Sequence, residues 1–231
     1  MTKTVVITGG GSGIGAACAT RFLEQGWQVI AGGLDQDETW PENLLFHPLD
    51  VTDVKAIEDF VARAPAEVHG LVNCAGIIAH TKEWQEDGFS RVLNVNLTAA
   101  FRMGTSLLAK LIAGRGGIVN IASMWSLFGA AQSPAYAASK TGLLGLTRSM
   151  AVAWGAKGVR VNAVAPGWIR TRLASKAMDD PVRGGQALAR IPLGRWGDPA
   201  DVARVIGFLL SEDAAYIHGV MLPIDGGYSI A

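Results

Sequence analysis

The stretch TVVITGGGSGIG, residues 4–15, decides the fold class. Its first five residues are all β-branched, which favours a buried strand, and the glycines after them open a helical pattern over about 13–25. In such a unit the backbone amides and the helix N-terminus face one point, which suits a pyrophosphate. A side chain at Gly9, Gly13 or Gly15 would block the turn, the ligand or the packing of helix on strand. The stretch therefore predicts a nucleotide-binding unit, although taken alone it also fits a merely tight turn.

Short apolar runs alternate with longer helical patterns along the rest of the chain. The runs predict strands over 27–32, 44–49, 69–73, 117–123, 159–166 and 219–227. The helical patterns predict helices near 52–63, 87–113, 134–155 and 199–211. Together they predict an α/β fold: a single doubly wound domain over residues 1–231, with a seven-stranded parallel sheet and helices on both faces.

Two segments depart from this alternation. The ten residues between Gly33 and Leu44 include Pro41, so we expect a loop or a single turn there instead of a full crossover helix. Residues 179–198 are rich in Gly and Arg, and we expect a mobile substrate lid over about 171–198.

The composition limits the partners. The chain has 231 residues, of which 49% are hydrophobic, and its 20 basic and 20 acidic residues give no net charge. A large core is expected, with small-molecule partners and neither nucleic acid nor membrane. The sequence lacks a signal or transit pattern and any apolar run near the ~18 residues of a membrane span, so we expect a cytoplasmic protein. Cys18, Cys74 and the four histidines lack metal-site spacing, so no metal is expected.

The stretch SPAYAASKTG, residues 133–142, places Tyr136 and Lys140 one helical turn apart. Ser133 and Pro134 suit the N-cap and the first helical position. A phenol with a pKa near 10 needs roughly 4 kcal/mol to titrate near neutrality. An ammonium at about 4 Å supplies that order of energy at an effective dielectric of about 20, so the pair makes a base only in a sheltered cleft. On an open helix surface the same pair would be unremarkable.

Several motifs in order resemble those of one family. They are TGGGSGIG (8–15), NCAG (73–76), NVN (94–96), a serine thirteen residues before Tyr136, YAASK (136–140) and PGWIRT (166–171). Over nearly the whole chain this pattern resembles the short-chain dehydrogenase/reductase family in its single-domain Rossmann form. The resemblance implies that Tyr136 is the general acid/base, that Lys140 lowers its pKa and holds the nicotinamide ribose, and that Ser123 binds the reacting oxygen. Asn96 would hold a water that connects the lysine to solvent.

The same match implies a set of residues that bind the cofactor. Asp50 would accept a hydrogen bond from the adenine amino group, although an N-cap for the helix near Thr52 explains it equally well. The loop after Gly167 would contact the nicotinamide amide. The expected contacts are Gly9, Ser12, Gly13, Ile14, Gly15, Asp35, Asp50, Val51, Asn73, Ala75, Gly76, Tyr136, Lys140, Pro166, Gly167, Ile169 and Thr171.

The match departs from the family at two places. Gly33 aligns where relatives carry the acidic residue for the adenosine ribose, and Asp35 is the nearest carboxylate to those hydroxyls. Neither Ser12 nor Leu34 supplies the basic group of NADP-preferring relatives, so NAD is the expected cofactor, with NADP as the alternative. Cys74 stands where relatives usually have a second asparagine.

The substrate is less well defined than the reaction. Trp125, Trp168 and Trp196 follow motif residues and predict a partly apolar pocket for a secondary alcohol or ketone, such as a polyol, sugar or cyclic alcohol. Arg170 and Arg172 could bind a carboxylate or phosphate or be solvated. A 3-oxoacyl-thioester reductase and a non-catalytic dinucleotide-sensing protein are the alternatives. The resemblance also implies a homotetramer, formed through the helices near 87–113 and 134–155 and the last strand.

Overall fold

The computed structural model describes residues 2–37, 40–41 and 44–231, and within them seven strands pair in parallel in the order β3-β2-β1-β4-β5-β6-β7. This confirms the predicted fold class. The strands are β1 (Thr4–Thr8), β2 (Gln28–Gly33), β3 (Phe46–Pro48), β4 (Gly70–Asn73), β5 (Gly117–Ile121), β6 (Arg160–Pro166) and β7 (Met221–Ile224). The strand order runs outward in both directions from the β1–β4 pair, and in open sheets of this kind ligands bind beyond the carboxyl ends at that point.

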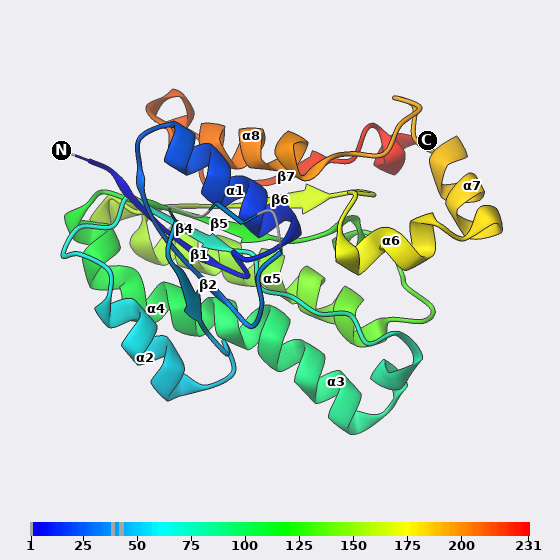
Figure 1. Cartoon of the computed structure of the whole chain (residues 1–231), viewed down its shortest axis with the longest axis horizontal. Coiled ribbons are helices and arrows are strands. Elements are labelled where there is room, and N and C mark those ends of the chain that lie inside the picture. The colour runs from blue at the N-terminus through cyan, green and yellow to red at the C-terminus, as the bar shows by residue number, and fades with distance from the viewer. Residues whose placement is uncertain (1, 38–39, 42–43) are drawn as a thin grey trace.

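Helices cover both faces of the sheet (Figure 1). The helices α1 (Gly13–Glu24) and α8 (Pro199–Leu210) pack on one face, and α2 (Val54–Ala62), α4 (Ala99–Ala113) and α5 (Pro134–Trp154) pack on the other. The remaining α-helices of the described residues are α3 (Glu86–Leu93), α6 (Arg172–Met178) and α7 (Pro181–Ala189), and the last two lie beyond the end of the sheet (Figure 1). Val5 and Ile7 of β1 pack with α1 and α8, while Val6 between them packs with α2, α4 and α5. The alternation of side chains along a strand therefore explains why one apolar run supplies two cores.

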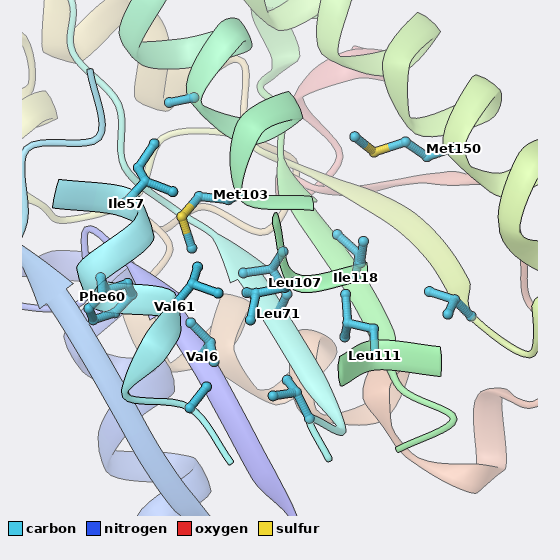
Figure 2. Packing of buried hydrophobic residues seen from close by; sticks show 14 of the residues in the cluster. Val6, Ile57, Phe60, Val61, Leu71, Met103, Leu107, Leu111, Ile118 and Met150 are labelled. Carbon is cyan, nitrogen blue, oxygen red and sulfur yellow. The ribbon is translucent and has the colours of Figure 1, made fainter. Parts of the chain in front are cut away.

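The larger core lies between the sheet and the α2, α4 and α5 layer (Figure 2). Leu71 of β4 and Ile118 of β5 meet Met103, Leu107 and Leu111 of α4, and all five are almost completely buried. This packing fixes the central strands, whose carboxyl ends carry motifs that the sequence analysis identified.

The glycine turn between β1 and α1 has the backbone that the sequence predicts. Gly9 and Gly13 have φ angles of +63° and +50°, in the left-handed region that favours glycine. A Cβ atom at Gly9 would lie 2.7 Å from Ala75 Cα, and one at Gly15 would collide with the Gly9 carbonyl oxygen. The turn thus lies directly against the loop that follows β4.

The expected helix over 87–113 is interrupted. It forms as α3 and α4 joined by a π-helical turn, Asn94–Thr98, which contains Asn96. The Asn96 side chain bonds to the backbone of Ile77 in both directions, at 2.9 and 3.0 Å, which holds it toward the loop after β4. The extra residue in the turn therefore has a structural cause, and π turns often occur at functional positions.

The two segments that depart from the alternation of strands and helices differ in their secondary structure. Within the 34–43 connection the described residues form no helix, and residues 38, 39, 42 and 43 lie outside the described part. The expected lid contains two helices that the sequence did not indicate, α6 and α7. The Asp180 side chain caps α7 by accepting from the amides of Val182 and Arg183. Among the described residues no helix is long and apolar enough to cross a membrane.

Candidate active site

A cavity of about 990 Å³ extends along the carboxyl ends of the strands. Its wall begins at the glycine turn after β1, includes the ends of β2, β3 and β4, and continues to residues after β5 and β6 and to α5, α6 and α7. The cavity is therefore where the strand order predicts a ligand site.

Tyr136 and Lys140 meet in this wall, as their helical spacing predicts. Their relative exposures are 8% and 4%, and Lys140 Nζ lies 5.5 Å from the centroid of the Tyr136 ring. Lys140 Nζ also donates a 2.6 Å hydrogen bond to the Ile121 carbonyl at the end of β5. The ammonium is thus held between the phenol-bearing helix and the adjacent strand.

Ser123 lies two residues beyond β5 on the same cavity wall. Its hydroxyl oxygen accepts a 3.2 Å hydrogen bond from the Trp125 amide. Because that bond uses a lone pair, the hydroxyl proton can be donated, and the Tyr136 hydroxyl oxygen is one acceptor within its reach.

The pKa shifts of Tyr136 and Lys140 differ from those that the sequence analysis predicts. Burial raises the pKa of Tyr136 to about 12, Ser123 opposes this rise, and Cys74 and Glu83 add to it. Burial also lowers the pKa of Lys140 to about 8. Without a bound cofactor the tyrosine pKa is thus raised and not lowered, because burial penalises the phenolate. The lowering by Lys140 that the resemblance implies stays a prediction.

A buried carboxylate that the sequence did not single out positions Tyr136. Glu83 lies in the 3₁₀ turn His80–Trp84 and is 1% exposed. It accepts hydrogen bonds from the amides of Ala79 at 2.7 Å and Tyr136 at 2.8 Å. The expected N-cap, Ser133, makes no side-chain capping bond, so Glu83 satisfies the third amide of α5 from another element. No local pattern could have shown this pairing across 53 residues.

Asn96 lies beneath the site and not in the cavity wall. Besides its bonds to Ile77, its amide nitrogen donates to the Ser139 hydroxyl at 3.1 Å, one residue before Lys140. The side chain thus joins the π turn and the loop after β4 to α5. The water relay that the resemblance implies stays a prediction.

Most of the expected cofactor contacts line the cavity. Those in the wall are Gly9, Ser12, Gly13, Ile14, Asp35, Asp50, Val51, Ala75, Gly76, Tyr136, Lys140, Pro166, Gly167, Ile169 and Thr171. Gly15 and Asn73 lie outside it: Gly15 packs on the glycine turn, and Asn73 donates to the Asn120 side chain at 2.8 Å.

The loop after β4 closes toward the glycine turn because of one hydroxyl. Thr8 Oγ accepts from the amides of Cys74 and Ala75 at 3.2 and 3.3 Å. A Cβ atom at Gly76 would lie in van der Waals contact with Lys140 Nζ, at 3.5 Å, so the loop after β4 lies close to the ammonium. Glycines, a helix N-terminus and a buried ammonium along one cavity fit a dinucleotide with a nicotinamide ribose beside Lys140.

In the half of the cavity at the ends of β2 and β3, two carboxylates, Asp35 and Asp50, follow these strands. Asp35 forms an ion pair of 2.7 Å with Arg172 of α6, which connects the end of β2 to the lid. Asp50 accepts from the Thr52 amide and hydroxyl, and these bonds lower its pKa. The alternative that Asp50 is the N-cap of the next helix is wrong, because Asp53 caps α2.

The half of the cavity that contains Ser123 and Tyr136, which we call the substrate half, is lined by aromatic side chains. Trp125 and Trp168 line the cavity as expected, while Trp196 packs on Trp168 with ring centroids 5.9 Å apart and lines a second cavity of about 500 Å³ together with Arg170. Sequence reasoning missed several wall residues that carry no motif, including His80, Arg91, Phe128, Arg183 and Tyr228. His80, the first residue of the 3₁₀ turn that contains Glu83, has a φ of +51°.

Comparison with known proteins agrees with this geometry. The family model described as enoyl-(acyl carrier protein) reductase matches residues 9–229. The 2,5-dichloro-2,5-cyclohexadiene-1,4-diol dehydrogenase of Sphingobium indicum is 36% identical, over 99% of this chain and 96% of that protein. This chain belongs to the short-chain dehydrogenase/reductase family. Accordingly, it is an NAD(P)-dependent oxidoreductase.

Other relatives in the family have different substrates. The 3-oxoacyl-(acyl-carrier-protein) reductase of Thermotoga maritima is 37% identical, over 99% of this chain and 98% of that protein. The solved structure of 4-hydroxyisoleucine dehydrogenase complexed with NADH matches with a TM-score of 0.91 at 32% identity and covers 100% of both chains. Membership of the family therefore establishes the reaction class but leaves the substrate open.

Replacing Glu83 with Gln tests its positioning role. The amide group of Gln has one acceptor where the carboxylate has two, so one buried amide loses its partner. We expect a loss of roughly 1–3 kcal/mol in the free energy of unfolding and a lower kcat with little change in KM, measured by urea denaturation and steady-state kinetics. Glu67→Gln, at an exposed position, is the control. Equal stability and kcat in the two variants would show that Glu83 does not position Tyr136.

Proposed function

We propose that the enzyme interconverts a secondary alcohol and a ketone, with Tyr136 as the general acid/base. The observation that carries this proposal is the convergence of Tyr136, Lys140 and Ser123 on one wall of a cavity that begins at the glycine turn. The overall reaction is secondary alcohol plus NAD(P)⁺ giving ketone, NAD(P)H and a proton.

The protein residues handle the proton and orient the oxygen, and the bound nicotinamide accepts or supplies the hydride. In the reductive direction the Tyr136 hydroxyl donates its proton to the carbonyl oxygen, and the Ser123 hydroxyl donates a hydrogen bond to the same oxygen. In the oxidative direction Tyr136 accepts the alcohol proton. Its raised pKa suits it to donate, so oxidation needs further positive charge beside the phenol.

The tryptophan-lined wall favours a compact, partly apolar alcohol such as a polyol, sugar or cyclic alcohol. The Sphingobium relative, whose name specifies a cyclic diol, agrees with this class. The Thermotoga relative favours a 3-oxoacyl-thioester reductase as the second candidate. A turnover screen with both classes of compound and both cofactors separates the two.

Tyr136→Phe tests the assignment of Tyr136 as the general acid/base. The same variant distinguishes an enzyme from a non-catalytic dinucleotide-sensing protein. Loss of the hydroxyl removes the proton donor, so we expect turnover to fall by about 10²–10⁴-fold. Cofactor binding, followed by fluorescence titration, should be retained. Tyr216→Phe, at a fully exposed position, should behave as wild type. Turnover that is unchanged in Tyr136→Phe would refute the assignment.

We propose NAD as the preferred cofactor because the end of β2 carries a carboxylate, Asp35, that would repel a 2′-phosphate. Asp35→Asn removes the repulsion and releases Arg172 from its ion pair, so the ratio of kcat/KM for NADP to that for NAD should rise about tenfold or more. Asp59→Asn on α2 is the control. A wild-type preference for NADP of tenfold or greater would contradict this proposal.

We further propose a cytoplasmic homotetramer. Phe101 of α4 and Val152 of α5 are 50% and 88% exposed on the helices that the resemblance assigns to subunit contacts, and Cys18 and Cys74 are unpaired. Light scattering at micromolar protein should report four subunits. A stable monomer would exclude the assembly.

A further inference from the structure

The lid places one guanidinium at the substrate half of the cavity. Arg183 is the third residue of α7, and its Cζ atom lies 5.9 Å from the centroid of the Trp168 ring. Both residues line the cavity that contains Ser123 and Tyr136. Within the described residues Arg183 makes no ion pair, whereas Arg172 is paired with Asp35.

Trp168 is held firmly enough to orient this guanidinium. It follows β6, and its carbonyl accepts a 2.9 Å hydrogen bond from the Gly197 amide. The neighbouring residue Ile169 forms a bridge with Gly197, and the Trp196 ring packs against Trp168. The contact with the ring uses no N–H donor, and among the described residues the Arg183 guanidinium donates no hydrogen bond to a side chain or backbone group, so its donors stay available for a planar anion.

Trp168, which Arg183 contacts, lies beside Ser123 at the carboxyl ends of two neighbouring strands. The end of β5 is paired with β6, since the Ala122 amide donates to the Val164 carbonyl at 2.8 Å. Ser123 and Trp168 therefore follow neighbouring strands. Asp35 and Asp50 follow β2 and β3, beyond β1 and β4, at the other end of the sheet.

The acidic and basic side chains of the cavity wall are distributed differently between its two halves. The two carboxylates in its wall, Asp35 and Asp50, belong to the β2–β3 half, and Arg172 at that half is neutralised by Asp35. In the described wall of the substrate half, Lys140 and Arg183 are not matched by any carboxylate. Glu83 faces backbone amides and is outside the wall. Arg183 is exposed, so water solvates its guanidinium in the absence of a ligand, and an anionic substrate would exchange that water for a charge-assisted pair.

We propose that the substrate is a hydroxy acid or keto acid whose carboxylate is bound by Arg183, while its hydroxyl or carbonyl oxygen is at Ser123 and Tyr136. This inference rests on the proposed function and specifies its substrate class. Trp125, Phe128 and Trp168 in the wall match a short or cyclic hydrocarbon body between the two polar ends. The pairing is a bidentate, charge-assisted one, which an amide or ester cannot reproduce.

The test compares wild type with Arg183→Gln and Lys176→Gln. Lys176 is exposed on α6 and outside the cavity wall, so the control removes one positive charge from the same lid. The substrates are pairs that differ in charge: 4-hydroxycyclohexanecarboxylate and its carboxamide, and 4-hydroxypentanoate and its amide. The kcat and KM values are measured for each with NAD and NADP.

We expect wild type and Lys176→Gln to use an acid with a kcat/KM about 10- to 100-fold above that of its amide, and Arg183→Gln to lose this preference mainly through a higher KM. Equal use of acid and amide by wild type, or equal losses in both variants, would overturn the carboxylate assignment while the proposed function stands. If none of the four compounds turns over, these alcohols are not substrates, and binding decides the inference.

That binding is measured by calorimetric titration of the NAD-loaded protein with cyclohexanecarboxylate and cyclohexanecarboxamide. Selective binding of the carboxylate that Arg183→Gln abolishes supports the inference. Equal binding of the two compounds, or binding of neither, overturns it.

Discussion

The site depends on the burial of one ammonium group. Lys140 Nζ is removed from water and held by the Ile121 carbonyl, at 2.6 Å. A buried cation is tolerated only where oxygen atoms compensate its lost hydration, so α5 must keep its place against the end of β5. That placement also brings the Tyr136 ring and Ser123 to the same wall, and it leaves the ammonium close to Gly76 of the loop after β4.

Exclusion of water has two opposing electrostatic effects at this site. It strengthens the field of Lys140, but it also raises the pKa of Tyr136 and lowers that of Lys140. The protein residues alone thus favour a protonated phenol that can donate to a carbonyl oxygen. Under the proposed mechanism, proton removal from an alcohol depends on positive charge that a bound oxidised cofactor would bring, and this would couple the protonation state of Tyr136 to occupancy of the site.

Buried polar side chains that reach across from other parts of the chain connect the elements of the site. Glu83 joins the turn after β4 to the first turn of α5, Asn96 joins the same loop to Ser139 in the second turn of α5, and Thr8 draws that loop toward the glycine turn. Each satisfies backbone amides or hydroxyls that would otherwise be unpaired. The loop after β4 therefore has little freedom, although none of its residues belongs to a strand or a long helix.

The sequence by itself determined the seven strands, the glycine turn and the Tyr136–Lys140 face, because β-branching, left-handed φ angles and helical spacing are properties of residues and their near neighbours. It did not show the π turn at Asn96, the Glu83 cap or the two lid helices. Only the tertiary structure paired Asp35 with Arg172, 137 residues away, and placed Arg183 over Trp168. These contacts arise where loops from separate strands meet at one edge of the sheet, and local spacing along the chain contains no information about which charges meet there.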